Sequence, residues 1–228
     1  MQVTAKRRRC LTGGAVFLTL ATLVAGCGPL LPPATPTSDS SPGAPASAAL
    51  PILTGTPQER LTAALSVLRH GYTFETVLTV GGEEAGRVVG RWFGGSSELT
   101  ITSSGATVTY RVVPPNAWLQ DESGAWVEAD AATTSGDPLT PLLTPSSVEA
   151  AAASDGSDAI LATYPAAALG LPGTDPVSVN ISITGDGAMT ARYETTVGTG
   201  AGVSETVLKP APAQDPVSAP SLLPQPSP

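Results

Sequence analysis

The sequence predicts an α+β domain in which a curved antiparallel sheet, a half-barrel, wraps over an N-terminal amphipathic helix and short inserted helices. Three observations predict this fold class. A capped segment with helical periodicity opens the domain, short strands with a period of two follow it, and a proline-rich insert interrupts them. Because an amphipathic helix and a one-sided sheet each need a covering layer, we expect them to cover each other.

Residues 56–71 predict the helix. Thr56 is a favourable N-cap, Pro57 fits the first helical position, and Glu59 completes a capping box. Gly71 is placed to end the helix. The apolar residues recur at the spacing of one helix face: Leu61, Ala64, Leu65 and Leu68.

Residues 72–129 predict an antiparallel meander, because the period changes from 3.6 to two. "AGRVVGRWF" places Val88 and Trp92 on one face and Arg87 and Arg91 on the other. The runs "ELTIT", "ATVTYRVV", "AWLQ" and "AWVEA" continue the pattern between turns. One face is apolar and the other carries Thr, Arg and Glu, so one side is expected to face water. In "YTFETVLTV" the apolar side holds Tyr72, Phe74, Leu78 and Val80.

The insert "GDPLTPLLTPSSVEAAAAS" separates this meander from a second one. Its prolines argue against a strand, and Thr144-Pro145 predicts a short helix that continues through Ala153. "YPAAALG" predicts another helical turn. Strands are expected again in "VSVNISI", "AMTARYETTV" and "VSETVL".

Residues 1–26 have the layout of a secretory signal: a basic start at residues 6–9, a short apolar run at 11–23, and small residues before Cys27. The apolar run is too short to span a bilayer comfortably. "LVAGC" resembles a bacterial lipobox, which implies a diacylglyceryl group on Cys27 and cleavage before it. That places the chain on the outer face of the cytoplasmic membrane. An ordinary secretory signal is the alternative, and the general or twin-arginine export route stays open.

Composition divides the rest of the chain. Residues 27–55 and 210–228 are Pro-rich and aperiodic, which predicts a disordered spacer after the lipidated cysteine and a disordered tail. Residues 56–209 then form one domain. Without residues 1–26 the chain carries 7 Lys+Arg against 19 Asp+Glu, a formal charge of -12. Clustered basic residues are absent, so nucleic acid is not an expected partner.

The residue inventory does not favour an enzyme. His70 is the single histidine, and in the last helical turn its cation would suit the helix dipole. No Cys/His cluster predicts a transition metal, no cofactor loop stands between a strand and a helix, and a catalytic triad would need His70. We therefore expect no catalytic residue, no metal and no cofactor.

The order of lipobox, spacer, capped helix, meander, "GDPLTPLLTP" insert and second meander resembles the LppX/LprG-like lipoproteins and the wider LolA-like carriers. The resemblance covers roughly residues 57–209. It implies a half-barrel around helices with an apolar cavity for a lipid or glycolipid. Ordinary core packing is the alternative role for the residues expected to line it. They are Leu65, Leu68, Phe74, Leu78, Trp92, Val108, Tyr110 and Trp118.

Three functions are consistent with this reading: a lipid or glycolipid carrier or sensor, an envelope module that binds a protein partner or the cell wall, and a module that regulates a membrane protein. Compared with the carriers that it resembles, the chain is short and poor in aromatic residues. All three share a membrane attachment through Cys27.

Overall fold

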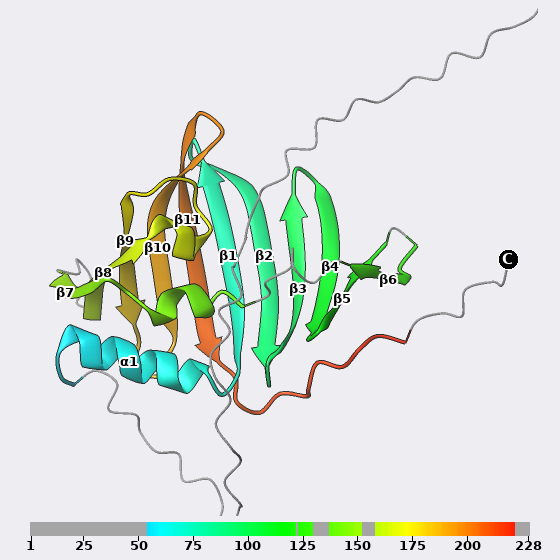
Figure 1. The fold of residues 1–228 in the computed structure, drawn as a ribbon, viewed down its shortest axis with the longest axis horizontal. Coiled ribbons are helices and arrows are strands. Elements are labelled where there is room, and N and C mark those ends of the chain that lie inside the picture. The colour runs from blue at the N-terminus through cyan, green and yellow to red at the C-terminus, as the bar shows by residue number, and fades with distance from the viewer. Residues whose placement is uncertain (1–53, 122, 130–136, 152–157, 222–228) are drawn as a thin grey trace, which may run out of the picture.

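In the part of the chain that the structure describes, eleven antiparallel strands form one open sheet with a single α-helix across one end (Figure 1). The computed structural model describes residues 54–121, 123–129, 137–151 and 158–221. The strand order is β6-β5-β4-β3-β2-β1-β11-β10-β9-β8-β7. The predicted α+β class with a curved antiparallel sheet is confirmed at this level.

The first half of the sheet is the predicted meander. Its strands are β1 (Tyr72–Val80), β2 (Glu83–Phe93), β3 (Ser96–Ser103), β4 (Ala106–Val113), β5 (Asn116–Gln120) and β6 (Trp126–Ala129). Each strand pairs with the next in the chain, because short turns connect them.

The second half runs from β7 (Ser147–Ala151) through β8 (Asp158–Pro165), β9 (Pro176–Ile183) and β10 (Met189–Val197) to β11 (Gly200–Pro210). β11 pairs with β1, so the last strand of the domain closes against the first and joins the two halves into one sheet. The described residues of this half of the chain include the 3-10 helices η2 (Thr140–Leu143) and η3 (Ala166–Leu169). η3 confirms the helical turn predicted from "YPAAALG".

Helix α1 (Pro57–Leu68) begins as the sequence predicts. The Glu59 backbone N–H donates to Thr56 Oγ1 at 3.3 Å, and the Thr56 backbone N–H donates to Glu59 Oε2 at 2.8 Å. The Thr56 backbone N–H and the Thr56 hydroxyl both donate to the Glu59 carboxylate, and these two bonds lower its pKa, the backbone bond most. The helix contacts β7 and β11, and its apolar residues are buried there: Leu61, Ala64, Leu65 and Leu68.

The helix predicted from Thr144-Pro145 through Ala153 is wrong for the residues that the structure describes. Residues 147–151 form β7 instead, which pairs with β8 along its length. The alanines favour a helix locally, but the ladder with β8 satisfies the backbone and overrides that propensity. β8 itself was not predicted, and it buries Ile160, Ala162 and Tyr164 in alternation.

The tail expected to be disordered from residue 210 is packed over part of its length. The Ala211 backbone N–H donates to the Gly71 carbonyl at 2.8 Å, and Gln214 Nε2 donates to the Trp92 carbonyl at 3.4 Å. Val217 is buried, with 5% of its surface exposed. Residues 211–221 therefore run beneath the ends of the first strands (Figure 1).

Cys27, the predicted signal at residues 1–26 and almost all of the predicted spacer lie outside the described residues. Within the described ranges, no helix is both long and apolar enough to cross a lipid bilayer.

Candidate functional site

Strand pairing assigns each side chain to one of two faces, because directly paired residues of an antiparallel ladder point to the same side. Tyr72, Phe74 and the residues paired with them face α1, and we call this side the inner face. Thr73, Glu75 and the residues paired with them form the outer face.

The inner face over Tyr72 and Phe74 of β1 and over β7–β11 is a closed core. α1 supplies Leu61, Ala64, Leu65 and Leu68, and η2 and the residues before it supply Leu139 and Leu142. The strands supply the other side of the core. Among its largest fully buried side chains are Tyr72, Tyr164, Ile160, Ile181, Met189 and Leu208.

Two tyrosine hydroxyls attach the insert to this core. The Tyr72 hydroxyl donates to Asp137 Oδ1 at 2.5 Å, and Asp137 also accepts the backbone N–H groups of Leu139 and Thr140. The Tyr164 hydroxyl donates to the Leu142 carbonyl at 3.2 Å. Burial and the Asp137 carboxylate raise the pKa of Tyr72, and burial raises the pKa of Tyr164 to about 12. Both phenols are therefore neutral donors at physiological pH.

The inner face over β2–β6 is different, because its apolar side chains are only partly covered by the described residues. We call this surface the inner strip and define it by six residues that follow one another across the strands. Val127 at the edge is 39% exposed, and the other five are half-buried. The inner strip consists of Val88, Ile101, Val108, Tyr110, Leu119 and Val127.

The inner strip continues from the core without a polar break. Leu99 on β3 is 5% exposed and belongs to the core, while its ladder partner Tyr110 is half-buried. Trp92 stacks on Tyr72, with ring centroids 5.6 Å apart and an interplanar angle of 15°. This stacking extends the aromatic packing of the core from β1 to β2.

The predicted lining residues fall into three groups. Leu65, Leu68 and Phe74 are buried in the core. Leu78, Trp92, Val108 and Tyr110 are half-buried on the inner face. Trp118 pairs with Arg111 and Glu128 on the outer face, so it cannot line a surface with the other seven.

A row of ionic and polar side chains crosses the outer face at the α1 end of the strands. Successive ladder pairs define this charged row as Lys209, Thr73, Arg91, Glu98 and Arg111. Arg111 Nε donates to Glu98 Oε2 at 2.7 Å, and Arg91 Nη2 lies 3.8 Å from the same oxygen. The Arg111 guanidinium also lies over Trp126, 4.8 Å from the ring centroid.

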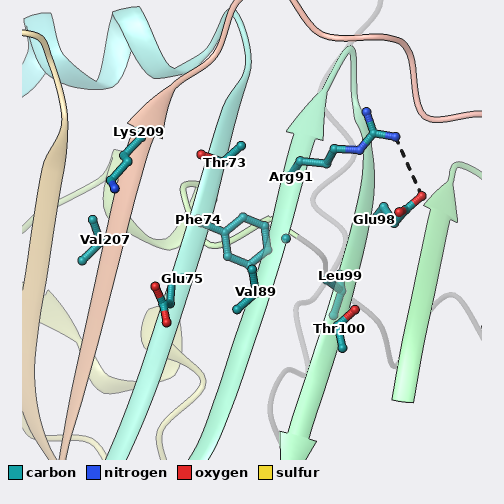
Figure 2. Close-up of a pocket in the computed structure, with 11 residues that line it drawn as sticks. Thr73, Phe74, Glu75, Val89, Arg91, Glu98, Leu99, Thr100, Val207 and Lys209 are labelled. Carbon is teal, nitrogen blue, oxygen red and sulfur yellow. Dashed lines mark ion pairs between the residues drawn. The ribbon is translucent and has the colours of Figure 1, made fainter. Parts of the chain in front are cut away.

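A shallow hollow of about 470 Å³ lies along this charged row (Figure 2). Figure 2 shows Arg91 extended toward Glu98, with Lys209 and Glu75 on neighbouring strands. Val89 in its lining is 47% exposed. The hollow therefore presents both charge signs beside one exposed apolar side chain.

The described residues hold no cluster of three or more His, Cys, Asp or Glu side chains that could bind a metal ion. The sequence placed Arg91 on the water-facing side but gave no sign of the charged row. The β1–β4 pairings align Thr73, Arg91, Glu98 and Arg111, and the β1–β11 pairing adds Lys209, which lies more than 100 positions further along the chain than Thr73.

No protein-family model and no curated protein matches the chain. One solved structure that it resembles is the S-type phycobiliprotein lyase CPES from Guillardia theta. The similarity covers 68% of this chain and 94% of that chain, at 8% sequence identity and a TM-score of 0.31. A similarity of this degree carries no argument about function.

Proposed function

We propose that this protein is an exported, lipid-anchored envelope protein that binds the acyl chains of a lipid or glycolipid on the inner strip. The observation that carries the proposal is the uneven covering of the inner face. The β7–β11 half is closed by α1 and the 3-10 helices, whereas the strip over β2–β6 keeps apolar side chains partly exposed.

The chemistry of the strip suits an acyl chain. Five of its six side chains are aliphatic, and the sixth, Tyr110, offers a ring with one hydroxyl. An acyl chain has no hydrogen-bonding groups to satisfy, and each methylene that it buries is worth about 0.8 kcal/mol. The half-barrel around a ligand that the LppX/LprG-like resemblance implies would form by closing this strip over the bound chain.

The predicted anchor on Cys27 gives this binding a location. Residues 28–55 would act as a spacer with a coil span of about 30 Å, enough to place the domain beside the membrane surface. Two or more acyl chains on Cys27 would make the attachment stable, whereas one chain gives only marginal binding. Replacing this residue, as Cys27→Ser, should release the protein or leave it unprocessed. A variant that stays processed and in the membrane fraction would refute the lipobox.

The charged row supports the alternative, an envelope module that binds a protein partner or the cell wall or regulates a membrane protein. Its hollow combines Lys209, Arg91, Glu98 and the exposed Val89, which fits a polar macromolecular surface. This alternative needs no lipid on the inner strip, so the two functions are separable by experiment.

A matched pair on β4 tests the acyl-chain proposal. Val108 lies on the inner strip, and the adjacent Thr109 faces outward and shares a 3.2 Å hydroxyl contact with Thr100. Val108→Glu should weaken uptake of a fluorescent fatty acyl probe about tenfold, because a carboxylate would have to lose its hydration there. Thr109→Glu should leave uptake unchanged.

Native mass spectrometry of the full chain carrying Cys27→Ser supplies the independent readout. In this Cys27→Ser background, we expect a lipid to co-purify with the chain that has no further change and with Thr109→Glu, but not with Val108→Glu. An apo mass for all three, with no probe uptake, would reject lipid binding and leave the envelope-module alternative.

A further inference from the structure

Strand β6 forms one edge of the sheet and leaves backbone groups facing away from β5. The Asp121 backbone N–H donates to the Ala125 carbonyl, which makes that pair a hydrogen-bonded one. Because hydrogen-bonded and non-bonded pairs alternate, Val127 and Ala129 bond to β5. The N–H and C=O groups of Trp126 and Glu128 therefore point to the free edge.

An exposed edge of this kind is a template for another strand. The edge is also where the inner strip ends, on Val127 with 39% of its surface exposed. Within the described residues, backbone groups without a strand partner and an exposed apolar side chain thus coincide on a four-residue strand. A partner strand would form hydrogen bonds with these backbone groups and would cover the Val127 side chain.

The sequence of β6 fits a second copy of itself in one register. A two-fold axis at Val127 places Val127 opposite Val127 of the second copy on the inner face, and Trp126 opposite Glu128 of the second copy on the outer face. An axis at Glu128 would set two carboxylates opposite each other, which is unfavourable. An axis at Trp126 would run the pairing into the turn at Gly124, whose φ is +82°.

The register centred on Val127 also gives the outward backbone groups of β6 hydrogen-bond partners. Trp126 and Glu128 are the residues with outward N–H and C=O groups, so their two cross-copy pairs would exchange four backbone hydrogen bonds. Charge is complementary too, since the Glu128 carboxylate of the second copy would approach the Arg111 guanidinium above Trp126. Within the described residues Glu128 has no ion pair of its own.

The other edge offers a poorer template. β7 contacts α1, so a second sheet that approached it would meet the helix. β6 lies at the far end of the sheet from α1 (Figure 1). Side-by-side pairing at β6 thus meets no described helix.

We propose that two copies of this chain associate through antiparallel β6–β6 pairing centred on Val127. The two-fold axis is perpendicular to the sheet, so both inner strips lie on the same side of one continuous sheet. The membrane anchor would favour this association by confining the copies to one surface. The pairing can be tested apart from lipid binding, because its hydrogen bonds come from the backbone of β6 and Val127 is the only strip residue at the pairing.

Disulfide cross-linking tests the register directly. Val127→Cys would face its own symmetry mate in a non-bonded pair, with Cα atoms about 4.5 Å apart, inside the disulfide range of roughly 4.4–6.8 Å. Glu128→Cys is the matched control, because its symmetry mate lies diagonally at roughly 7–8 Å. Both are made in the full chain carrying Cys10→Ser and Cys27→Ser, so that each protein has one thiol.

After mild oxidation, the covalent dimer on a non-reducing gel should be about tenfold more abundant for Val127→Cys than for Glu128→Cys. Equal yields, or no dimer with Val127→Cys, would overturn the proposal. If β6 pairs with a different protein, no Val127→Cys dimer forms, and that result also overturns it. Adding fatty acid should not change the yield, which separates this result from the fate of the lipid-binding proposal.

A proline variant tests the backbone bonds. In the Val127→Cys background, Glu128→Pro removes only an outward N–H and should reduce the disulfide yield about tenfold, whereas Glu128→Ala should not. Circular dichroism checks that both remain folded. If Glu128→Pro cross-links as well as Glu128→Ala, the hydrogen-bonded pairing is wrong.

Discussion

Tyr72 and Asp137 join the first strand to the insert across 65 residues of chain, through a hydrogen bond of 2.5 Å. Asp137 also accepts three bonds from the start of η2, from the Leu139 and Thr140 backbone and from the Thr140 hydroxyl. The Tyr72 ring is fully buried between Phe74 and Trp92. One phenol therefore fixes the position of the segment that covers the core.

Tyr72→Phe should lower the free energy of unfolding by about 1.5–3 kcal/mol, since the lost hydrogen bond has a charged acceptor. Tyr164→Phe is the control, because its hydroxyl bonds a neutral carbonyl, and it should cost about 0.5–1.5 kcal/mol. Urea unfolding of both variants measures the difference. Equal losses would show that the Asp137 carboxylate adds nothing.

The stability of the fold should fall at high pH because of these two tyrosines. Burial raises the pKa of Tyr164 to about 12 and, with Asp137, raises that of Tyr72. In the unfolded chain both ionise near pH 10, so the unfolded state loses protons first. Their contribution is complete below about pH 10 and is lost as the pH rises through the folded-state values.

The measurement is urea unfolding between pH 8 and pH 11.5. Each tyrosine accounts for at most about 1.4 kcal/mol per pH unit above pH 10. Tyr164→Phe should therefore show a shallower decline than wild type, whatever its stability at neutral pH. Parallel declines would contradict the role given to Tyr164.

Gly90 and Gly86 face the inner side of β2 four residues apart, yet they differ in surroundings. A Cβ at Gly90 would lie 2.7 Å from the Glu98 carbonyl oxygen and 2.7 Å from Phe74 Cζ, whereas one at Gly86 would approach nothing closer than 3.5 Å. Gly90→Ala should cost about 1–3 kcal/mol through overpacking. Gly86→Ala should be neutral within about 0.5 kcal/mol. Thermal unfolding compares the two, and similar melting temperatures would contradict the close packing of Phe74.

Local signals made much of this fold predictable. The Thr56–Glu59 capping box and the strand–turn repeats of residues 72–129 act within a few residues, so the sequence shows them directly. The β7 strand is decided by β8, a partner that the alanine-rich sequence does not reveal. Long-range pairing, not local preference, set the parts that were missed.

The candidate site shows the same division. Trp118 and Leu119 are adjacent apolar residues, so alternation alone cannot say which one faces inward. The β4–β5 register decides it, by pairing Leu119 with Tyr110 and Trp118 with Arg111. The register therefore places Trp118, a predicted lining residue, on the outer face and Leu119 on the inner face.

The packed part of the C-terminal tail should stabilise the domain. Arg91 Nη1 donates to the Asp215 carbonyl at 3.1 Å, and Val217 two residues later is 5% exposed. Val217→Ala should lower the free energy of unfolding by about 1–2 kcal/mol, from two buried carbons. Ser218→Ala, at an exposed position, is the control. If both variants have the melting temperature of the wild type, Val217 in the tail does not contribute to stability.

The last prediction concerns space on the inner face. Leu78 is half-buried, and its ladder partners are Gly86 on β2 and Ser204 on β11, both small. If this part of the face receives an acyl chain, Leu78→Trp should change the free energy of unfolding by less than about 1 kcal/mol, because the larger ring fills space left by its neighbours. It should also reduce uptake of a fluorescent acyl probe by occupying the ligand's place.

Leu208→Trp supplies the contrast on the adjacent strand, since Leu208 is 0% exposed within the core. Overpacking there should cost about 1–3 kcal/mol. Melting temperature and probe uptake are measured together for both variants and the wild type. Unchanged melting with lost uptake for Leu78→Trp supports lipid binding. A loss of stability as large as that of Leu208→Trp, with no uptake by the wild type, means that Leu78 is ordinary core and that the protein acts through its outer surface.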